Sequence, residues 1–555
     1  MALKKYCIIA LLVIMAMMLP VGSSIVVAAP PPEYTAGLHT GWMTETSTAN
    51  SSWVFNRTFE YYIPSSCNVT NNATPVPLLF SFHGLGSNGP AQIDLTKFAA
   101  LAQQEGFIAV FPDSTALDPN DSRWSGCMTA NNWTLPGLTG SNIMWNCGDI
   151  NGTPIAPLQY CAGVDDAGFV ADMVDWFETN YAINTSRIYS TGMSNGAMFS
   201  YYLAFNLAGV FAGIGPVTGP MDLNLGNATT TPAPTTVIAI RSPTDPIIPE
   251  AGECTPEGHP VHMCNNFGYS TPDTITYWHE VNNTTTGPVT TVFHDSDIDD
   301  STITRYVYSG GTNGTRVVLF WETGNVGGYD IGHTWPGGPQ YTVAYYIGSV
   351  SCQIDGSAQI WKYLPPLKYC LTIHSSSTMG SVTTPGHNAF TTASDSTTGV
   401  QISTTTLFFS AGTGPTVVNL TATPASGYEF VNWTGDVSTI AAVTAATTTI
   451  NITANTDYVI KAKFQIKSET PPSGGCFIAT AAYGTPTAKQ IDVLRAFRDD
   501  VLLKSSVGSR LVDFYYRTSP PIANFISEHN VVRTLVRELL VDPIVRVLEA
   551  TRTIW

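Results

Sequence analysis

The sequence of 555 residues predicts an α/β protein with a mostly parallel, doubly wound sheet, followed by a small all-β module and a C-terminal helical domain. Apolar runs at 236–240 and 316–321 have the composition of buried parallel strands. A β-prone segment at 187–191 and an apolar, helix-compatible segment at 197–208 enclose a glycine-rich turn. After residue 366 the pattern changes to short alternating strands, and later to helical spacing.

The glycine-rich turn contains a G-x-S-x-G pattern, Gly192-Met193-Ser194-Asn195-Gly196. A strand, a sharp turn and a helix would place the Ser194 hydroxyl on an exposed corner, with small residues on both sides relieving the strained backbone. A serine hydroxyl is a poor nucleophile until an imidazole accepts its proton, and that imidazole needs a carboxylate to fix its tautomer. The turn therefore predicts Ser194 as a nucleophile that requires two partners.

Candidates for the acid and the base follow the serine in the chain. Asp245 lies in the loop after the first apolar run, and His333 lies in the Gly-rich loop after the second. Open α/β sheets place their functional sites in such loops. Taken singly, these two residues would be interpreted as a turn-forming aspartate and a packed loop histidine. The order serine, acid, histidine predicts a catalytic triad of Ser194, Asp245 and His333.

An acyl-transfer site also needs donors for the developing oxyanion. The apolar strand at 76–82 leads into a His-Gly loop that begins at His83. Loops of this kind contribute one backbone N–H to the oxyanion hole, and the residue after the nucleophile contributes the other. We expect these donors to be the backbone N–H groups of Leu85 and Asn195. Because His83 precedes the serine, we expect it to have a structural role near the loop rather than to be the catalytic base.

Several motifs between residues 50 and 365 resemble the polyhydroxybutyrate depolymerase and feruloyl esterase family of α/β-hydrolases. They are Phe82-His83-Gly84, Trp145-Asn146, 164–169, the G-x-S-x-G turn, Thr244-Asp245-Pro246 and 332–337. The resemblance implies an α/β-hydrolase fold and a secreted serine esterase that uses Ser194, Asp245 and His333, and we expect neither a metal nor a cofactor. Arg241-Ser242 stands where the family usually has His-Gly, and Ala197 replaces the usual Gly after the turn. These departures leave the triad unchanged and affect the expected shape of the acyl pocket.

The substrate class stays open at this stage. Trp145 and Trp335 are candidates for substrate contacts, because exposed aromatic rings suit sugar or phenolic rings. Loop tryptophans also bury themselves against their own domain. The substrate could be a polyhydroxyalkanoate, or a feruloyl or acetyl ester on a polysaccharide. The alternative is a surface-binding or adhesive protein whose hydrolase-like domain is a platform, but three triad candidates in the right order favour the enzyme.

The N-terminus and the cysteines indicate export. Lys4 and Lys5 precede an uncharged apolar run at 8–19, which is too short to span a bilayer, and small residues follow up to Ala28. We therefore expect a signal peptide at 1–28 and a secreted or extracellular protein. The net charge of −17 argues against a nucleic-acid partner. An even set of cysteines suggests disulfides: Cys67, Cys127, Cys147, Cys161, Cys254, Cys264, Cys352 and Cys370.

Composition and pattern predict two domains before the last linker. The hydrolase domain is expected at 30–366, where a helix-like segment is closed by two prolines. A β module is expected at 368–466, because short alternating strands there are separated by Gly, Thr and Pro. Within it, the segment 427–436 resembles the divergent internalin-type B repeat, a small β module of exported proteins. A spacer or adhesive role is favoured over a specific binding site.

The last part of the chain is predicted to be helical. A linker at 467–475 leads to a domain at 476–555, which opens with a Cys-Phe-Ile box at Cys476. This box resembles the one that begins a C-terminal domain on many exported microbial proteins. The domain has ten Lys and Arg against eight Asp and Glu, whereas the rest of the chain is acidic. Two interpretations of this domain remain open. It is either a small helical domain that packs only on itself, or a domain that retains the protein at the cell envelope.

Overall fold

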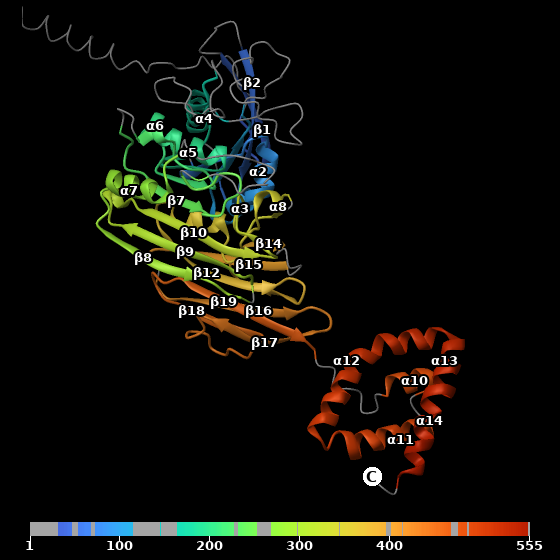
Figure 1. Ribbon diagram of the computed structural model, residues 1–555. Coiled ribbons are helices and arrows are strands. Elements are labelled where there is room, and N and C mark those ends of the chain that lie inside the picture. Colours follow the sequence, from blue (N-terminus) through green and yellow to red (C-terminus); the bar gives the residue numbers. More distant parts are fainter. Residues whose placement is uncertain are drawn as a thin grey trace, which may run out of the picture. The chain divides into compact units, whose positions relative to one another are not determined.

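The computed structural model describes residues 32–46, 54–67, 73–114, 145, 164–226, 231–251, 253, 268–296, 298–342, 344–395, 401–412, 414–467, 476–485 and 488–552. They belong to two compact units, Met1–Gln465 and Ile466–Trp555, whose elements are labelled in Figure 1. The predicted signal peptide at 1–28 lies outside the described residues, as does the predicted linker beyond Lys467.

The first unit is organised around an 11-stranded sheet with the order β1-β2-β4-β3-β5-β6-β7-β10-β9-β8 and β11 paired to β10. Neighbouring strands from β4 to β10 are parallel. The strands at both edges are antiparallel, so the sheet is mixed and the predicted parallel strands form only its centre. The strands are β1 (Gly37–Thr46), β2 (Val54–Ile63), β3 (Val76–Phe82), β4 (Ile108–Pro112), β5 (Ile183–Met193), β6 (Gly213–Val217), β7 (Thr236–Arg241), β8 (Thr286–Phe293), β9 (Ser301–Ser309), β10 (Val317–Val326) and β11 (Tyr329–Asp330).

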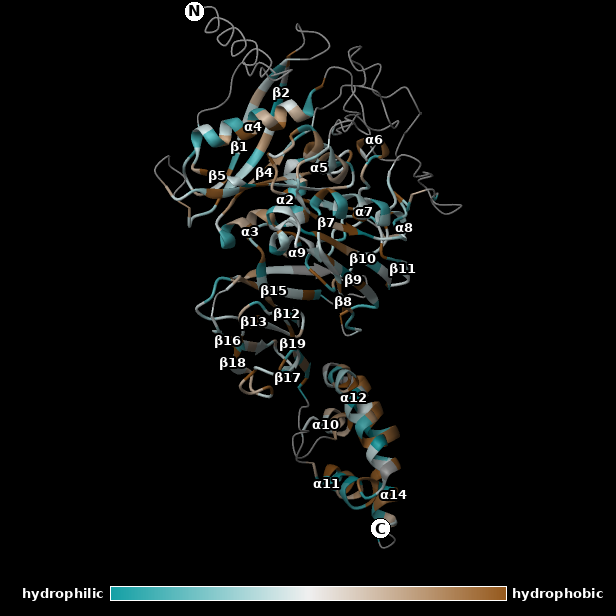
Figure 2. Cartoon of the chain, turned by 90° about the vertical axis from the view of Figure 1, so that its left-hand side faces the viewer, coloured by the Kyte–Doolittle hydropathy of each residue, from teal (hydrophilic) through white to brown (hydrophobic). Residues whose placement is uncertain are grey.

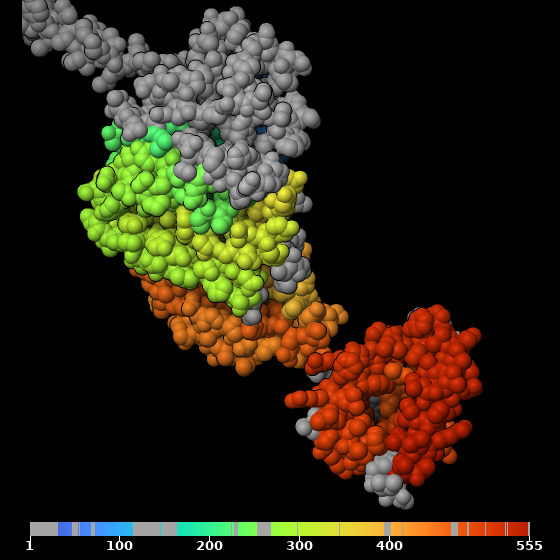
Figure 3. Space-filling model, in the orientation of Figure 1, coloured from blue at the N-terminus to red at the C-terminus, as the bar shows by residue number. Residues whose placement is uncertain are grey.

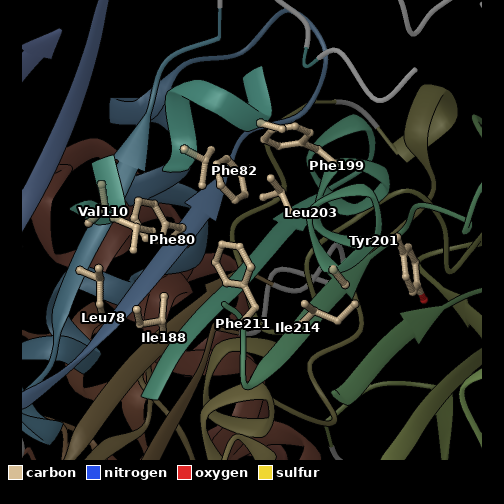
Figure 4. Close-up of a cluster of buried hydrophobic side chains, with 14 of the residues drawn as sticks. Leu78, Phe80, Phe82, Val110, Ile188, Phe199, Tyr201, Leu203, Phe211 and Ile214 are labelled. Atoms are coloured by element: carbon tan, nitrogen blue, oxygen red, sulfur yellow. The ribbon is translucent and has the colours of Figure 1, made fainter. Parts of the chain in front are cut away.

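Helices cover both faces of the sheet, as the doubly wound prediction requires. Side chains alternate between the two faces along a strand, so Leu78 and Phe80 of β3 lie in one core cluster and Leu79 lies in another. The first cluster, shown in Figure 4, includes residues of α4, α5 and α7, and the second includes residues of α3 and α9. The helices are α2 (Gly89–Thr96), α3 (Phe98–Glu105), α4 (Asp166–Asn180), α5 (Asn195–Asn206), α6 (Leu223–Gly226), α7 (Thr271–Asn282), α8 (Ala344–Ile347) and α9 (Gly356–Tyr363).

The chain after residue 366 forms the expected β module, built from two smaller sheets. Their strand orders are β14-β15-β12-β19-β17 and β13-β16-β18. Alternation along β19 buries Tyr458, Ile460 and Ala462 in a core that also contains Trp433. The strands are β12 (Lys368–Ser376), β13 (Gly380–Thr383), β14 (Phe390–Asp395), β15 (Gln401–Ser410), β16 (Thr416–Pro424), β17 (Tyr428–Gly435), β18 (Thr447–Ile452) and β19 (Tyr458–Ile466).

The β module packs directly against the large sheet and its helices in the same unit, as Figure 3 shows for the orange and the green residues. Phe390 of β14 is buried in the second core cluster of the large sheet. The buried ammonium of Lys362, at the end of α9, donates to the carboxylate of Asp457 in the module. Thr392 donates to Asp355, the N-cap of α9, at 2.7 Å. The interface therefore combines apolar burial with charged contacts.

The second unit is helical, as predicted. Its core combines alanines with branched residues such as Ile491, Val545 and Leu548. Within the described part of the chain, no helix combines the length and the apolar character needed to cross a membrane. The helices are α10 (Phe477–Tyr483), α11 (Lys489–Phe497), the π-helical η3 (Arg498–Leu502), α12 (Ser506–Glu528), α13 (Asn530–Val536), the π-helical η4 (Arg537–Val541) and α14 (Asp542–Ala550).

The expected disulfides are not found at two of the eight cysteines. Cys67 and Cys370 have free thiols. Cys370 is buried on β12, and its sulfur lies 3.7 Å from Thr372 Oγ1 and 3.8 Å from Asp457 Oδ1. Cys127, Cys147, Cys161, Cys254 and Cys264 lie outside the described residues.

We expect a chain that ends at residue 366 to be less stable than one that ends at residue 466. The shorter chain exposes the apolar surface that contacts Phe390 and leaves the buried ammonium of Lys362 without Asp457. Removing one partner of a buried ion pair costs roughly 3–5 kcal/mol where the remaining charge stays enclosed by protein, and less where water reaches it. Urea unfolding followed by tryptophan fluorescence measures the difference. Lys362→Met in the shorter chain should restore part of the stability, and equal unfolding midpoints for the two chains would contradict the expectation.

Candidate active site

The turn at Ser194 has the strained geometry of a nucleophile elbow. Ser194 links β5 to α5 with φ 59° and ψ −118°, in a region that non-glycine residues rarely occupy. Its backbone N–H donates to the carbonyl of Val217 at the end of β6, at 2.9 Å. A Cβ on Gly192 would lie 2.5 Å from the Gly196 carbonyl, and a Cβ on Gly196 would lie 2.3 Å from the Phe82 oxygen. Both glycines are therefore required by close backbone packing.

Asp245 and His333 form a buried acid–base pair. Asp245 Oδ2 lies 2.8 Å from His333 Nδ1, and the two residues are only 2% and 5% exposed. Asp245 Oδ1 accepts the backbone N–H groups of Ile247 and Ile248 at 2.8 and 2.9 Å, which fixes the carboxylate in the loop. With Nδ1 donating to the carboxylate, Nε2 is the nitrogen that can accept a proton from a nucleophile.

The sheet brings the three triad candidates to one edge. Ser194 follows β5, Asp245 follows β7 and His333 follows β10, and these strands are parallel with only β6 between β5 and β7. Their carboxyl ends meet at the same edge, which is where open α/β sheets hold their sites. Among the described residues, no hydrogen bond joins Ser194 Oγ to His333. Catalytic hydrogen bonds are often long in proteins without substrate.

Three further buried side chains lie near the acid: Arg241, Ser242 and Glu322. Arg241 at the end of β7 places Nη1 3.9 Å from Asp245 Oδ2. Ser242 donates to the carbonyl of Ile331 at 2.8 Å, so the acid loop is tied to the segment that precedes His333. Glu322 of β10 is fully buried, and its carboxyl oxygens have no hydrogen-bond partner among the described residues. Burial, together with the nearby Asp299 and Asp245, raises the pKa of Glu322 well above its usual value.

His83 has a structural role in the candidate oxyanion loop. Its Nε2 accepts the backbone N–H of Ser114 at 3.1 Å, so the ring proton must be on Nδ1, which lies 2.8 Å from the carbonyl of Gly84. Burial lowers the pKa of His83 to about 4 and keeps the ring neutral near pH 7. Because the peptide is planar, holding the Gly84 carbonyl also orients the N–H of Leu85.

Trp145 is buried between the His-Gly loop and Asn195, which differs from the expected substrate contact. Its indole N–H donates to the carbonyl of His83 at 3.0 Å, and its ring stacks on Phe199 of α5 with centroids 4.9 Å apart. The Trp145 backbone N–H donates to Asn195 Oδ1 at 2.6 Å, and Asn195 Nδ2 donates back to the Trp145 carbonyl at 3.2 Å. Trp145 therefore joins the His-Gly loop to the first residue of α5.

Trp335 is also buried, so neither candidate tryptophan presents its ring to a substrate. Its indole N–H donates to Ser357 Oγ at 3.1 Å, and its ring packs against Phe98 in the second core cluster. Trp335 lies two residues after His333 and anchors that loop on α9 and α3. Both tryptophans are core residues because their N–H groups find partners inside the protein.

A buried charge cluster behind Trp145 was not indicated by the sequence. Arg57 of β2 contacts Glu45 of β1 at 2.8 Å and Asp166 of α4 at 2.5 Å, and all three side chains are almost fully buried. Burial raises the pKa of Glu45 to about 7. The Arg57 guanidinium carbon lies 4.1 Å from the ring centroid of Phe169 and 6.0 Å from that of Trp145. Asp166 belongs to the 164–169 motif, but it lies 109 residues from Arg57 in the sequence, so only the fold reveals that the three charged residues form a cluster.

Partly exposed tyrosines lie after His333 and were also missed. The Tyr341 hydroxyl donates to the His333 carbonyl at 2.9 Å, while the residue as a whole is 48% exposed. Tyr345 and Tyr346 are adjacent on α8, with ring centroids 5.4 Å apart, and both are exposed. The density of tyrosines between residues 329 and 346 is the signal that sequence reasoning could have used.

Comparison with known proteins confirms two of the resemblances that the motifs indicate, the one to the esterase family and the one to the B repeat. Residues 375–468 match the family model of the divergent InlB B-repeat domain. The chain is similar to feruloyl esterase B of Neurospora crassa, at 29% identity over 25% of this chain and 37% of the relative. It is also similar to a bifunctional acetylxylan esterase/xylanase of Neocallimastix patriciarum, at 27% identity over 35% of this chain and 22% of the relative.

A third relative and a solved structure were also found. Poly(3-hydroxyalkanoate) depolymerase C of Paucimonas lemoignei is 27% identical over 26% of this chain and 28% of its own length. The chain thus matches between about a fifth and two fifths of the length of these relatives. An acetyl xylan esterase structure from Aspergillus awamori superposes with a TM-score of 0.31 at 15% identity, covering 53% of this chain and 94% of that chain.

The neutral state of His83 predicts a pH-dependent contribution to stability. Because the folded pKa of His83 lies below its ordinary value of 6.5, the unfolded chain binds the extra proton as the pH falls from about 6.5 to 4. The contribution of His83 is therefore present near pH 7 and is lost toward pH 4, by about 3 kcal/mol for a shift of this size. Urea unfolding of the wild type and of His83→Asn across this range measures it. The difference in free energy of unfolding should shrink toward pH 4, and parallel profiles would contradict the assignment.

Replacing Trp145 by Phe should reduce turnover more than substrate affinity. The variant keeps most of the packing but leaves the His83 carbonyl without its buried donor, which costs about 1–3 kcal/mol. We expect kcat to fall about tenfold at nearly constant KM, because a donor aimed at the oxyanion acts mainly in the transition state. Steady-state kinetics on p-nitrophenyl acetate tests this.

The matched control is Trp433→Phe in the β module. The Trp433 indole is also buried and also donates to a backbone carbonyl, that of Ala445 at 3.0 Å. This control should lose comparable stability without the fall in kcat. An equal fall in kcat in both variants would show that Trp145 acts only through general stability.

Proposed function

We propose that this chain is a secreted serine esterase with an α/β-hydrolase fold that cleaves carboxylic esters through an acyl-serine intermediate. The observation that carries the proposal is the buried Asp245–His333 pair, at the sheet edge where the strained turn holds Ser194. The similarity to acetylxylan and feruloyl esterases and to a polyhydroxyalkanoate depolymerase supports the same chemistry. The predicted signal peptide supports export.

The geometry supports a two-step mechanism. His333 Nε2 accepts the proton of Ser194 Oγ as this oxygen attacks the ester carbonyl carbon. Asp245 holds the ring in the required tautomer and stabilises its positive charge. The oxyanion is bound by the N–H groups of Leu85 and Asn195, and its collapse expels the alcohol, which takes the proton from His333. Water then attacks the acyl-serine with His333 as base, which releases the acid and restores Ser194.

The proposed substrates are feruloyl or acetyl esters on polysaccharide, or polyhydroxyalkanoates. Both classes occur in the names of the relatives. The exposed rings of Tyr345 and Tyr346, close to His333 in the chain, suit a large substrate with sugar or phenolic rings. An adhesive protein with a hydrolase-like platform is the alternative, but it has no use for an ordered carboxylate–imidazole pair beside a strained serine.

Ser194→Ala should abolish ester hydrolysis and leave the protein folded. The site depends on one hydroxyl, and removal of a triad nucleophile can lower kcat by about 10⁶. Turnover is measured on p-nitrophenyl acetate, methyl ferulate, acetylated xylan and 3-hydroxybutyrate oligomers, with circular dichroism to confirm folding. Ser186→Ala, which removes an exposed serine from the same strand β5, is the control and should keep full activity. A folded Ser194→Ala protein with wild-type turnover would refute the assignment.

A further inference from the structure

The longest helix of the second unit has two apolar faces, only one of which is packed. The inner face of α12 is buried and includes Val512, Ala523 and Ile526. A second set of apolar side chains recurs at intervals of three, four or eight residues, which places them on one other face of the helix. They are between 49% and 77% exposed: Val507, Leu511, Phe514, Ile522 and Phe525. Figure 2 shows hydrophobic stretches of α12 in brown between hydrophilic stretches in teal.

The last three helical elements, α13, η4 and α14, also have one buried and one exposed set of apolar residues. Val541, Val545 and Leu548 are buried in the core of the unit. Other large apolar residues of α13, η4 and α14 are between 44% and 74% exposed: Val531, Leu535, Leu539, Leu540, Ile544 and Val547. A surface helix of a globular protein normally presents polar residues opposite its packed face. We call the two exposed sets the outer apolar faces.

The outer apolar faces are large compared with the core of the unit. The buried core cluster contains two alanines, one cysteine and five branched residues: Cys476, Ala479, Ala482, Ile491, Val493, Val541, Val545 and Leu548. More large apolar side chains point outward than inward. Exposed apolar surface of this extent marks a site that another surface covers.

The charge distribution indicates which kind of surface this is. The second unit contains 11 Lys and Arg and 9 Asp and Glu, a net charge of +2, whereas residues 1–465 contain 13 and 32, a net charge of −19. From α12 to the end of the chain every basic residue is an arginine. Arg510, Arg517 and Arg546 are exposed and form no ion pair among the described residues. An anionic surface would therefore repel residues 1–465 and attract the second unit.

We propose that the outer apolar faces bind an anionic lipid surface. In this arrangement α12, α13 and α14 lie at the boundary between the lipid headgroups and the acyl chains. Helices that lie in a membrane interface combine Phe and Leu on one face with Arg or Lys beside it. Arg510 and Arg517 adjoin Leu511 and Phe514, so their guanidinium groups can reach lipid phosphates while the apolar rings and branches enter the acyl boundary. Among the described residues no helix can span a membrane, so the contact is interfacial.

A second copy of the chain is the competing occupant of these faces. The buried centre of a protein interface is depleted of charged residues, and an enclosed guanidinium needs a carboxylate partner. In the second unit the arginines are interleaved with the exposed apolar residues along the helices. A lipid surface satisfies both groups at once because its phosphates lie just above its acyl chains.

The test measures vesicle binding by the full mature chain. Co-sedimentation is compared for vesicles of phosphatidylcholine alone and for equal mixtures of phosphatidylcholine and phosphatidylglycerol. We expect at least tenfold stronger partitioning onto the anionic vesicles, reduced by salt. Phe514→Gln with Phe525→Gln should lower partitioning at least tenfold, and Arg510→Gln with Arg517→Gln should remove the preference for anionic lipid.

The control replaces two equally exposed apolar residues of the first unit, Val289→Gln with Val417→Gln, and should bind as the wild type does. The proposal would be overturned if the wild type bound the anionic vesicles no more strongly than the variant with Phe514→Gln and Phe525→Gln. Sedimentation equilibrium distinguishes the competing occupant: a dimer that the phenylalanine substitutions dissociate, without vesicle binding, would assign the faces to a second copy. Vesicle binding does not require ester hydrolysis, so its outcome is independent of the proposed function.

Discussion

The close backbone contact between the nucleophile turn and the end of β3 is the constraint on which the candidate site depends. Gly192 and Gly196 approach each other and the carbonyl of Phe82 so closely that neither could carry a side chain. This contact holds Ser194 in its strained conformation, and it also fixes where the His-Gly loop begins. The proposed oxyanion donors, the N–H groups of Leu85 and Asn195, belong to the two segments that meet at this contact, so the same packing positions both segments together with Ser194.

Buried polar contacts extend this constraint outward. The carbonyls of His83 and Gly84 are each held by a buried ring nitrogen, from Trp145 and from the His83 side chain. Behind Trp145, the ion pairs of Arg57 connect the edge strands to α4. Each donor in this series is buried, so losing one partner leaves the other group unsatisfied. The loops of the candidate site are thus held by the core of the first unit rather than by solvent-exposed bonds.

The two units use apolar residues in different ways. In the first unit the apolar residues of the sheet are enclosed by helices and by the β module, whose Phe390 completes a core cluster of the large sheet. In the second unit comparable numbers of apolar residues remain outside a small core. The first arrangement produces a rigid scaffold for chemistry, and the second produces a surface suited to association.

The sequence by itself predicted the strand–turn–helix at Ser194, the order of acid and base, the parallel strands at the centre of the sheet, the β module and the helical end. These follow from local glycine requirements and from the period of apolar residues, which are properties of short segments. Only the tertiary structure decided the roles of Trp145 and Trp335, the antiparallel edges, the tight packing of the module and the cluster around Arg57. Burial and hydrogen-bond or ion pairing depend on neighbours that are distant in the chain, so they cannot be predicted from a short segment of sequence.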